Sequence, residues 1–301
     1  MSSTSSSRAV GLTALAAIFW GTNFEATRFV LTDLSPWTAA ALRFAVAAAI
    51  ILLWLILTEG IDRRGLARNA PAFVVLGALG IAGFNAALCL GMGSSSPVTA
   101  ALIMATTPLS TNLIDALVAR RMPRPAALLG MALSLTGVAL TVGAFAGAAL
   151  SPGDLMILGG SLCVSCFTVF SRRWVKESSP LATTTWTMVA GALLLLTGAL
   201  AFEHPLAEAL AAPAPVWGVT LWMAIAGSVL AFLFWTIGIR VRGPGPTAIL
   251  FNIVPVSALV IATLAGRMPG PAQLGGVTLT ILGVLVASGR LRLPGRRPAR
   301  A

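Results

Sequence analysis

Hydrogen-bonding and aromatic side chains interrupt several long apolar runs of the sequence, and their spacing predicts a shared surface. Trp20, Asn23 and Phe24 stand at positions i, i+3 and i+4, so they occupy one face of a helix. Pro108 and Pro255 each remove a backbone hydrogen bond and leave a carbonyl oxygen free to accept another donor. Such groups bind a solute without covalent chemistry. The expected substrate-binding residues are Trp20, Asn23, Phe24, Asn85, Met104, Pro108, Asn112, Trp186, Phe232, Trp235, Asn252 and Pro255.

A structural role is the competing interpretation for each of these residues taken singly. Amide side chains join neighbouring membrane helices at around 0.6 kcal/mol each, and a deep Trp also packs a core. For one Asn the two interpretations stay open. Convergence of the whole set on one cavity favours contact with a substrate.

Three charged residues lie inside or beside the first two apolar runs. Glu25 and Arg43 are each about six residues from the end that the two runs share, which places both roughly 9 Å deep. They can therefore form a structural ion pair, and Arg28, one turn from Glu25, can share it. A proton-coupling role for Glu25 is the alternative.

Motifs for catalysis or for a cofactor are missing from the sequence. It has no HExxH, GxSxG, GxGD or Walker A motif, and its single histidine, His204, falls in a loop. Cys163 and Cys166 form a CxxC inside an apolar run, where small residues that pack a helix explain them better than redox or metal chemistry does. We therefore expect no enzyme, no metal site and no cofactor.

The composition indicates a membrane protein. Of 301 residues, 57% are apolar and only 10% are charged, and the mean hydropathy is +0.92. A water-soluble domain has about a quarter of its residues charged. The net charge of +11 does not indicate a nucleic-acid partner, because the basic residues lie in short loops between apolar runs.

Ten of these runs are long enough to cross a bilayer as helices. Of the 20 basic residues, 17 fall in alternate loops or in the two terminal segments, which the positive-inside tendency assigns to the cytoplasm. Both termini are therefore predicted to be cytoplasmic. The predicted spans are residues 9–31, 37–58, 71–92, 96–119, 125–148, 153–175, 180–202, 215–239, 244–266 and 271–289.

The two halves of the chain resemble each other. Arg121, Met122 and Pro123 recur as Arg267, Met268 and Pro269, a shift of 146 positions. Five spans in each half force the copies into opposite orientations, as in many secondary transporters. We expect a tail at residues 1–8, repeats at 9–148 and 153–289, and a basic tail at 290–301.

Glycines give the fifth and tenth spans a packing role. Gly130 and Gly137 lie two turns apart on one helix face, and Gly276 and Gly283 repeat this spacing. Small residues let membrane helices approach closely. These spans are therefore a scaffold or the contact surface of a homodimer.

Short ordered motifs connect the sequence with a known family. The segment FWGTNF at residues 19–24, followed by ALRF at 41–44, resembles the opening of EamA-type members of the drug/metabolite transporter superfamily. TAAL at 99–102 and TPL at 107–109 resemble the later part of the same repeat. The family usually has Glu-Arg after helices 4 and 9, whereas this chain has Arg120-Arg121 and Gly266-Arg267.

The resemblance implies an exporter or exchanger of ten helices with a central cavity formed mainly by helices 1, 3, 4, 6, 8 and 9. Amino-acid exporters of the YddG type fit best. Branches that recognise phosphate fit worse, because helices 3, 4, 8 and 9 carry no basic residue in their interiors.

The leading functional hypothesis is a secondary transporter that exports amino acids or similar zwitterionic or neutral metabolites by alternating access. Its expected partners are the small-molecule substrate and the lipid bilayer. An exporter of drugs or apolar metabolites is the second hypothesis, and an intramembrane enzyme or a receptor is remote. Arg outnumbers Lys nineteen to one, which suggests GC-rich coding and a bacterial inner membrane.

Overall fold

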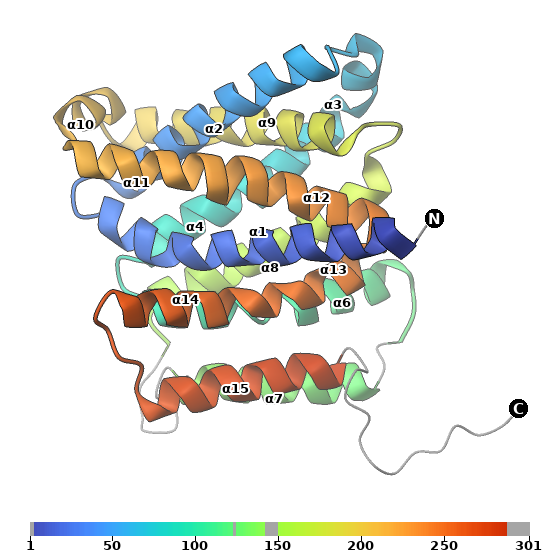
Figure 1. The fold of residues 1–301 in the computed structure, drawn as a ribbon, viewed down its shortest axis with the longest axis vertical. Coiled ribbons are helices and arrows are strands. Elements are labelled where there is room, and N and C mark those ends of the chain that lie inside the picture. Colours follow the sequence, from blue (N-terminus) through green and yellow to red (C-terminus); the bar gives the residue numbers. More distant parts are fainter. Residues whose placement is uncertain (1–2, 123–124, 142–149, 288–301) are drawn as a thin grey trace, which may run out of the picture.

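The computed structural model describes residues 3–122, 125–141 and 150–287, and within these ranges every regular element is helical (Figure 1). The predicted all-helical class is thus confirmed for them. The ends of the fifth and tenth predicted spans and the basic tail lie outside the described residues.

The first half contains seven α-helices, and a π-helix joins the third of them to the fourth. They are α1 (Ser3–Val30), α2 (Pro36–Thr58), α3 (Arg63–Gly77), η1 (Ala78–Gly83), α4 (Phe84–Gly91), α5 (Pro97–Met104), α6 (Thr107–Val118) and α7 (Pro125–Thr141). The second half repeats this order with a short α-helix and a four-residue 3-10 helix added. Its elements are α8 (Pro152–Trp174), α9 (Pro180–Phe202), the short α10 (Pro205–Ala211), α11 (Ala214–Ala224), η3 (Ile225–Leu230), α12 (Ala231–Arg242), α13 (Pro244–Ala248), η4 (Ile249–Asn252), α14 (Ile253–Leu264) and α15 (Pro271–Ala287).

Among the described residues, seven helices are long and apolar enough to cross a membrane, so the protein is a multi-pass membrane protein. The other three predicted spans correspond to α1, α7 and α15, which lie outside that set. The seven are Pro36–Thr58, Arg63–Gly91, Thr99–Val118, Pro152–Trp174, Pro180–Phe202, Ala214–Arg242 and Pro244–Leu264.

Two helices begin earlier than the spans predicted from the sequence. The helix α1 begins at Ser3, so residues 3–8, expected as a tail, extend it. The third span begins at Arg63, where the Asp62 side chain accepts the Arg64 N–H as an N-cap, and Pro71 lies inside the helix. Proline is a poor boundary signal here because a capping side chain upstream decides where the helix starts.

The most regular sign of duplication is a pair of π-helices that the sequence analysis missed. Each six-residue π-helix, η1 and η3, interrupts a long apolar helix, and the two begin 147 positions apart. Near their centres stand Gly80 and Gly227. Pro108 and Pro255 share the shift of 147, each near a break in its helix. Single-turn π segments inside helices occur frequently at functional sites.

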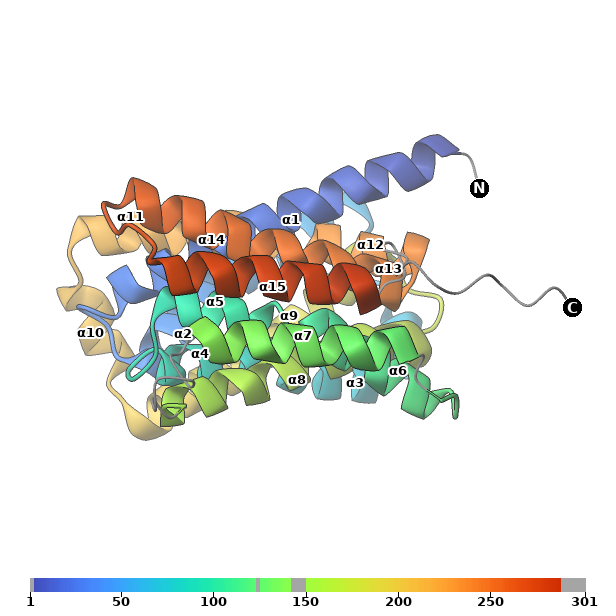
Figure 2. The same cartoon turned by 90° about the horizontal axis from the view of Figure 1, so that it is seen from below.

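Helix packing follows the same pairing. The helix α1 packs on α12 and α14, and its counterpart α8 packs on α4 and α6. Between the halves, α2 packs on α9, and α7 lies beside α15 along one side of the bundle (Figures 1 and 2). The start of α1 and the end of α15 lie at the same end of the bundle (Figure 1).

That end gathers the basic loops and is called the basic end below. Arg68 pairs with Glu177, and the Asn69 side chain bonds the backbone of Lys176. Asp115 pairs with Arg121 and Arg173. At the opposite end, the Glu203 carboxylate accepts the first free N–H groups of α2.

The α7–α15 contact is nearly symmetric. The Ser134 hydroxyl donates to the carbonyl oxygen of Thr280 at 3.0 Å, and the Thr280 hydroxyl returns a bond to Ser134 at 3.3 Å. Gly137 and Gly283 let the backbones approach on either side of this pair. The glycine faces predicted for a scaffold or a homodimer therefore cover each other within one chain, which supports the scaffold role.

We predict that Gly137→Ala destabilises the protein. The added Cβ would lie 2.6 Å from the carbonyl oxygen of Gly276, on a backbone that cannot retreat. Overpacking of this kind costs about 1–3 kcal/mol. The matched control is Gly159→Ala, since nothing lies within 4 Å of its added Cβ. Thermal unfolding in detergent should show a lower midpoint for Gly137→Ala alone, and equal midpoints would contradict the prediction.

Candidate substrate site

Four aromatic rings form a contiguous cluster at the centre of the bundle. The Trp20 ring lies 5.3 Å from Phe232, 5.1 Å from Trp235 and 5.3 Å from Phe251. All four side chains are buried. The helix α1 thus meets α12 and η4 here, and the predicted residues Trp20, Phe232 and Trp235 come together.

The carbonyl oxygen of Gly227 collects polar groups beside this cluster. It accepts the Trp20 Nε1 hydrogen at 3.0 Å and the Arg43 Nη2 hydrogen at 3.1 Å. Gly227 belongs to the π-helix η3, which departs from the hydrogen-bond pattern of an α-helix. The π-helix η3 therefore links α1 and α2, although neither is its neighbour in sequence.

Arg43 is buried among neutral acceptors. Its Nε donates to the Ser228 hydroxyl at 2.8 Å, and its Nη1 lies 3.4 Å from the Asn85 side-chain oxygen. The guanidinium also sits 4.8 Å above the Phe44 ring. The predicted ion pair with Glu25 is wrong, because the side chain of Arg43 turns toward η3 and α4.

Glu25 pairs instead with Arg267, which lies beyond the end of α14. The Glu25 side chain is only 9% exposed, so the pair closes the end of the bundle opposite the basic end. Arg28 is exposed, and the ion pairs of the described residues do not include it. Arg43 was expected as the partner of Glu25 because both lie at a similar depth in the membrane. Depth alone cannot distinguish Arg43 on α2 from Arg267, which the fold brings close from far along the chain.

The amides of the predicted Asn residues leave acceptors unused. Asn85, Asn112 and Asn252 donate their Nδ2 hydrogens to carbonyl oxygens of their own helices. The side-chain oxygens of Asn23 and Asn252 are buried without a hydrogen-bond partner. An unpaired buried acceptor costs about 1–3 kcal/mol, so these two oxygens do not join helices together.

The remaining predicted residues divide into two groups. Phe24, Met104, Pro108 and Pro255 are buried and pack in the core. Trp186 is half-buried and lines a separate cavity of about 180 Å³ at the basic end, between α2, α3 and α9. The structure therefore does not bring Trp186 into the central cluster.

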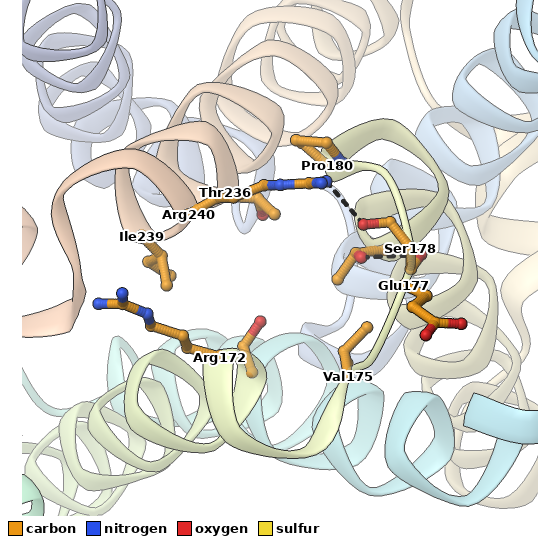
Figure 3. Close-up of a pocket in the computed structure, with 10 residues that line it drawn as sticks. Arg172, Val175, Glu177, Ser178, Pro180, Thr236, Ile239 and Arg240 are labelled. Carbon is orange, nitrogen blue, oxygen red and sulfur yellow. Dashed lines mark hydrogen bonds between the residues drawn. The ribbon is translucent and has the colours of Figure 1, made fainter. Parts of the chain in front are cut away.

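A second cavity of about 180 Å³ opens at the basic end between α8, α9 and α12 (Figure 3). Arg172 of α8 and Arg240 of α12 stand on different walls, and Arg240 donates to the Ser178 carbonyl oxygen at 2.7 Å. Thr236, which follows Trp235, lies on the α12 wall. This cavity therefore approaches the aromatic cluster from the basic end.

The sequence analysis missed Gly227, Ser228 and Phe251. Gly227 carried a usable signal, since it repeats Gly80 at the same shift as the two prolines. Ser228 and Phe251 carried none, because single polar or aromatic residues in apolar runs are common.

Comparison with known proteins agrees with this architecture. Residues 7–143 and 151–289 each match the EamA-like transporter family. The chain belongs to that family. Two curated relatives cover nearly its whole length. An uncharacterized transporter of Bacillus subtilis, YyaM, is 38% identical over 92% of both chains. A probable terminal-alkyne amino-acid exporter of Streptantibioticus cattleyicolor is 26% identical over 97% of this chain and 99% of that protein.

A solved crystal structure shows the same fold as this EamA-like transporter. It superposes with a TM-score of 0.69 over 93% of this chain and 96% of its own, at 24% identity. The family match and the two curated relatives confirm the resemblance read from the motifs.

For this EamA-like transporter we predict that Glu25 and Arg267 act as one structural unit. Glu25→Gln and Arg267→Gln should each lower the thermal midpoint, and the double variant should lose little more, because the second change breaks a pair already broken. The coupling free energy should be about 1 kcal/mol. Fully additive losses in detergent unfolding would show that the two residues do not interact.

Proposed function

We propose that the chain is a secondary transporter that exports amino acids or related small zwitterionic or neutral metabolites across the inner membrane of a bacterium. One observation carries the proposal. Buried hydrogen-bonding groups without suitable partners, the oxygens of Asn23 and Asn252, lie on helices that meet at the aromatic cluster. Polar groups fix the orientation of a small ligand, and apolar rings accept its variable part. The name of the Streptantibioticus relative agrees with an amino-acid substrate.

Alternating access is the proposed mechanism, in ten spans arranged as two inverted repeats of five with both termini in the cytoplasm. The described contacts close the end with Glu25–Arg267, and the cavities open at the basic end. With the basic end in the cytoplasm, this arrangement faces inward. Export then requires the opposite end to open as the basic end closes.

Export of drugs or apolar metabolites is the second candidate, favoured by the size of the aromatic cluster. Growth of a host strain in toxic apolar compounds distinguishes the two candidates. Protection by the transporter, without amino-acid transport in vesicles, would favour the second one.

Labelled amino acids in liposomes test the proposal. The wild type should exchange labelled against unlabelled amino acid faster than empty vesicles do. Asn252→Ala should raise KM about fivefold, since one hydrogen bond to substrate is worth about 1 kcal/mol. Thr197→Ala, on an exposed face of α9, is the matched control and should behave as wild type. Absence of exchange for every amino acid would refute the proposal.

Thiol labelling tests the inverted topology. In a variant whose native cysteines are replaced by alanine, Arg64→Cys and Arg173→Cys should react with an impermeant reagent from the cytoplasmic side only. Leu210→Cys, on α10, should react from the other side only. Labelling of Arg64→Cys and Arg173→Cys from different sides would contradict the inverted repeat.

A further inference from the structure

Arg43 is a buried charge for which the chain supplies no carboxylate. All nine acidic residues are described, and each has partners elsewhere. Burial of an unpaired charge in a membrane protein is costly and marks a functional site by default. Three of the acidic residues form ion pairs: Glu25 with Arg267, Asp115 with Arg121 and Arg173, and Glu177 with Arg68. The other six accept hydrogen bonds: Asp33 from Thr32, Glu59 from Ser179, Asp62 from the Arg64 N–H, Asp154 from Ser95 and the Ser151 N–H, Glu203 from the Trp37 and Thr38 N–H groups, and Glu208 from the Ser35 N–H.

The acceptors that surround Arg43 are weak substitutes for a carboxylate. A guanidinium has five N–H donors, and the structure engages three of them, with a serine hydroxyl, a backbone carbonyl and an amide oxygen. The Nη1 contact with Asn85 is the longest, at 3.4 Å. A carboxylate would take two parallel bonds from the same group. Asn85 is the partner most easily displaced.

The duplicated fold does not need a cation at this position. Counted from the matching Ser-Pro steps at Ser35 and Ser179, Arg43 corresponds to Thr187. The Thr187 hydroxyl bonds the Thr183 carbonyl oxygen of its own helix at 2.8 Å, and α9 packs there without any charge. Helix packing alone therefore does not account for Arg43.

An unused acceptor lies next to the same π-helix. The Asn23 side-chain amide lies so close to Gly227 that a Cβ on this glycine would overlap it. Its oxygen is buried and has no hydrogen-bond partner. The Arg43 guanidinium, which has no anionic partner, and the Asn23 oxygen, which has no donor, therefore both lie next to Gly227. The Trp20 indole also contacts this residue, through its hydrogen bond to the Gly227 carbonyl oxygen.

We propose that Arg43 binds the α-carboxylate of the transported amino acid, and that the unpaired Asn23 oxygen accepts its ammonium group. The aromatic cluster then faces the side chain of the substrate. In the empty protein Ser228, Gly227 and Asn85 hold the guanidinium in place. This inference rests on the proposed function, which gives amino acids as the substrates. It adds which residue of the protein recognises the carboxylate that amines lack.

Three probes with one side chain test it in liposomes: L-phenylalanine, L-phenylalaninamide, which lacks the carboxylate, and 3-phenylpropionate, which lacks the amino group. The wild type should carry phenylalanine with a KM about 10- to 100-fold below that of either analogue, the range expected for a hydrogen bond to a charged group. In Arg43→Gln the KM of phenylalanine should rise to that of phenylalaninamide. The KM of phenylalaninamide should stay within twofold of its wild-type value. Asn23→Leu should remove the advantage over 3-phenylpropionate.

Thr187→Val is the matched control, and it should change no KM by more than twofold. Arg43→Lys keeps the charge and should recover part of the preference, which separates charge recognition from loss of folding. If the Arg43 variants do not fold, the wild type still decides: equal KM values for phenylalanine and its amide overturn the inference.

Equal losses for all three probes in Arg43→Gln would also overturn it and would make Arg43 structural. These results leave the proposed function standing, because phenylalanine is still carried by the wild type. A wild type that carries neither phenylalanine nor any other amino acid overturns the proposed function itself, and this inference with it.

Discussion

Hydrogen bonds to the carbonyl oxygen of Gly227 hold the centre of this protein together. In a bilayer no water can satisfy an exposed backbone group, so every carbonyl that leaves the helical pattern must find a donor within the protein. This carbonyl belongs to the π-helix η3, and Trp20 and Arg43 both donate to it. The same two bonds place an indole ring and a guanidinium next to each other. The geometry of the centre thus follows from one irregular turn of helix.

Comparison of the two π-helices shows which of these contacts occur in only one half of the chain. Gly80 stands in the first π-helix where Gly227 stands in the second, and Phe167 packs so closely on Gly80 that a Cβ there would overlap its ring. Phe167 corresponds to Trp20 at the same shift of 147. The backbone is duplicated, but the aromatic ring on Gly80 has no N–H to donate. Side-chain hydrogen bonds to the π-helix from a Trp and an Arg are therefore found on the face formed by α1, α2 and η3.

The sequence predicted the features that depend on local pattern. Apolar runs located the helices, and the helical spacing of Trp20, Asn23 and Phe24 placed them on one buried face. Features that depend on the fold escaped prediction. The partner of Glu25 lies 242 positions away at Arg267, and depth in the membrane could not identify it. The π-helices have no signal in composition, since an extra residue in a turn changes the periodicity only locally.

The two ends of the bundle are closed by different interactions, and this difference limits how the protein can move. Opposite the basic end, a carboxylate caps the start of α2 and the Glu25–Arg267 pair joins α1 to the segment after α14. Opening there breaks charge-assisted bonds, which water can replace as it enters. At the basic end, ion pairs such as Arg173–Asp115 are partly exposed, and one cavity there is lined by Thr236, the neighbour of Trp235 in the chain. Exposed pairs contribute little to stability. The ion pairs at the basic end are therefore weaker constraints than the buried carboxylate contacts at the opposite end.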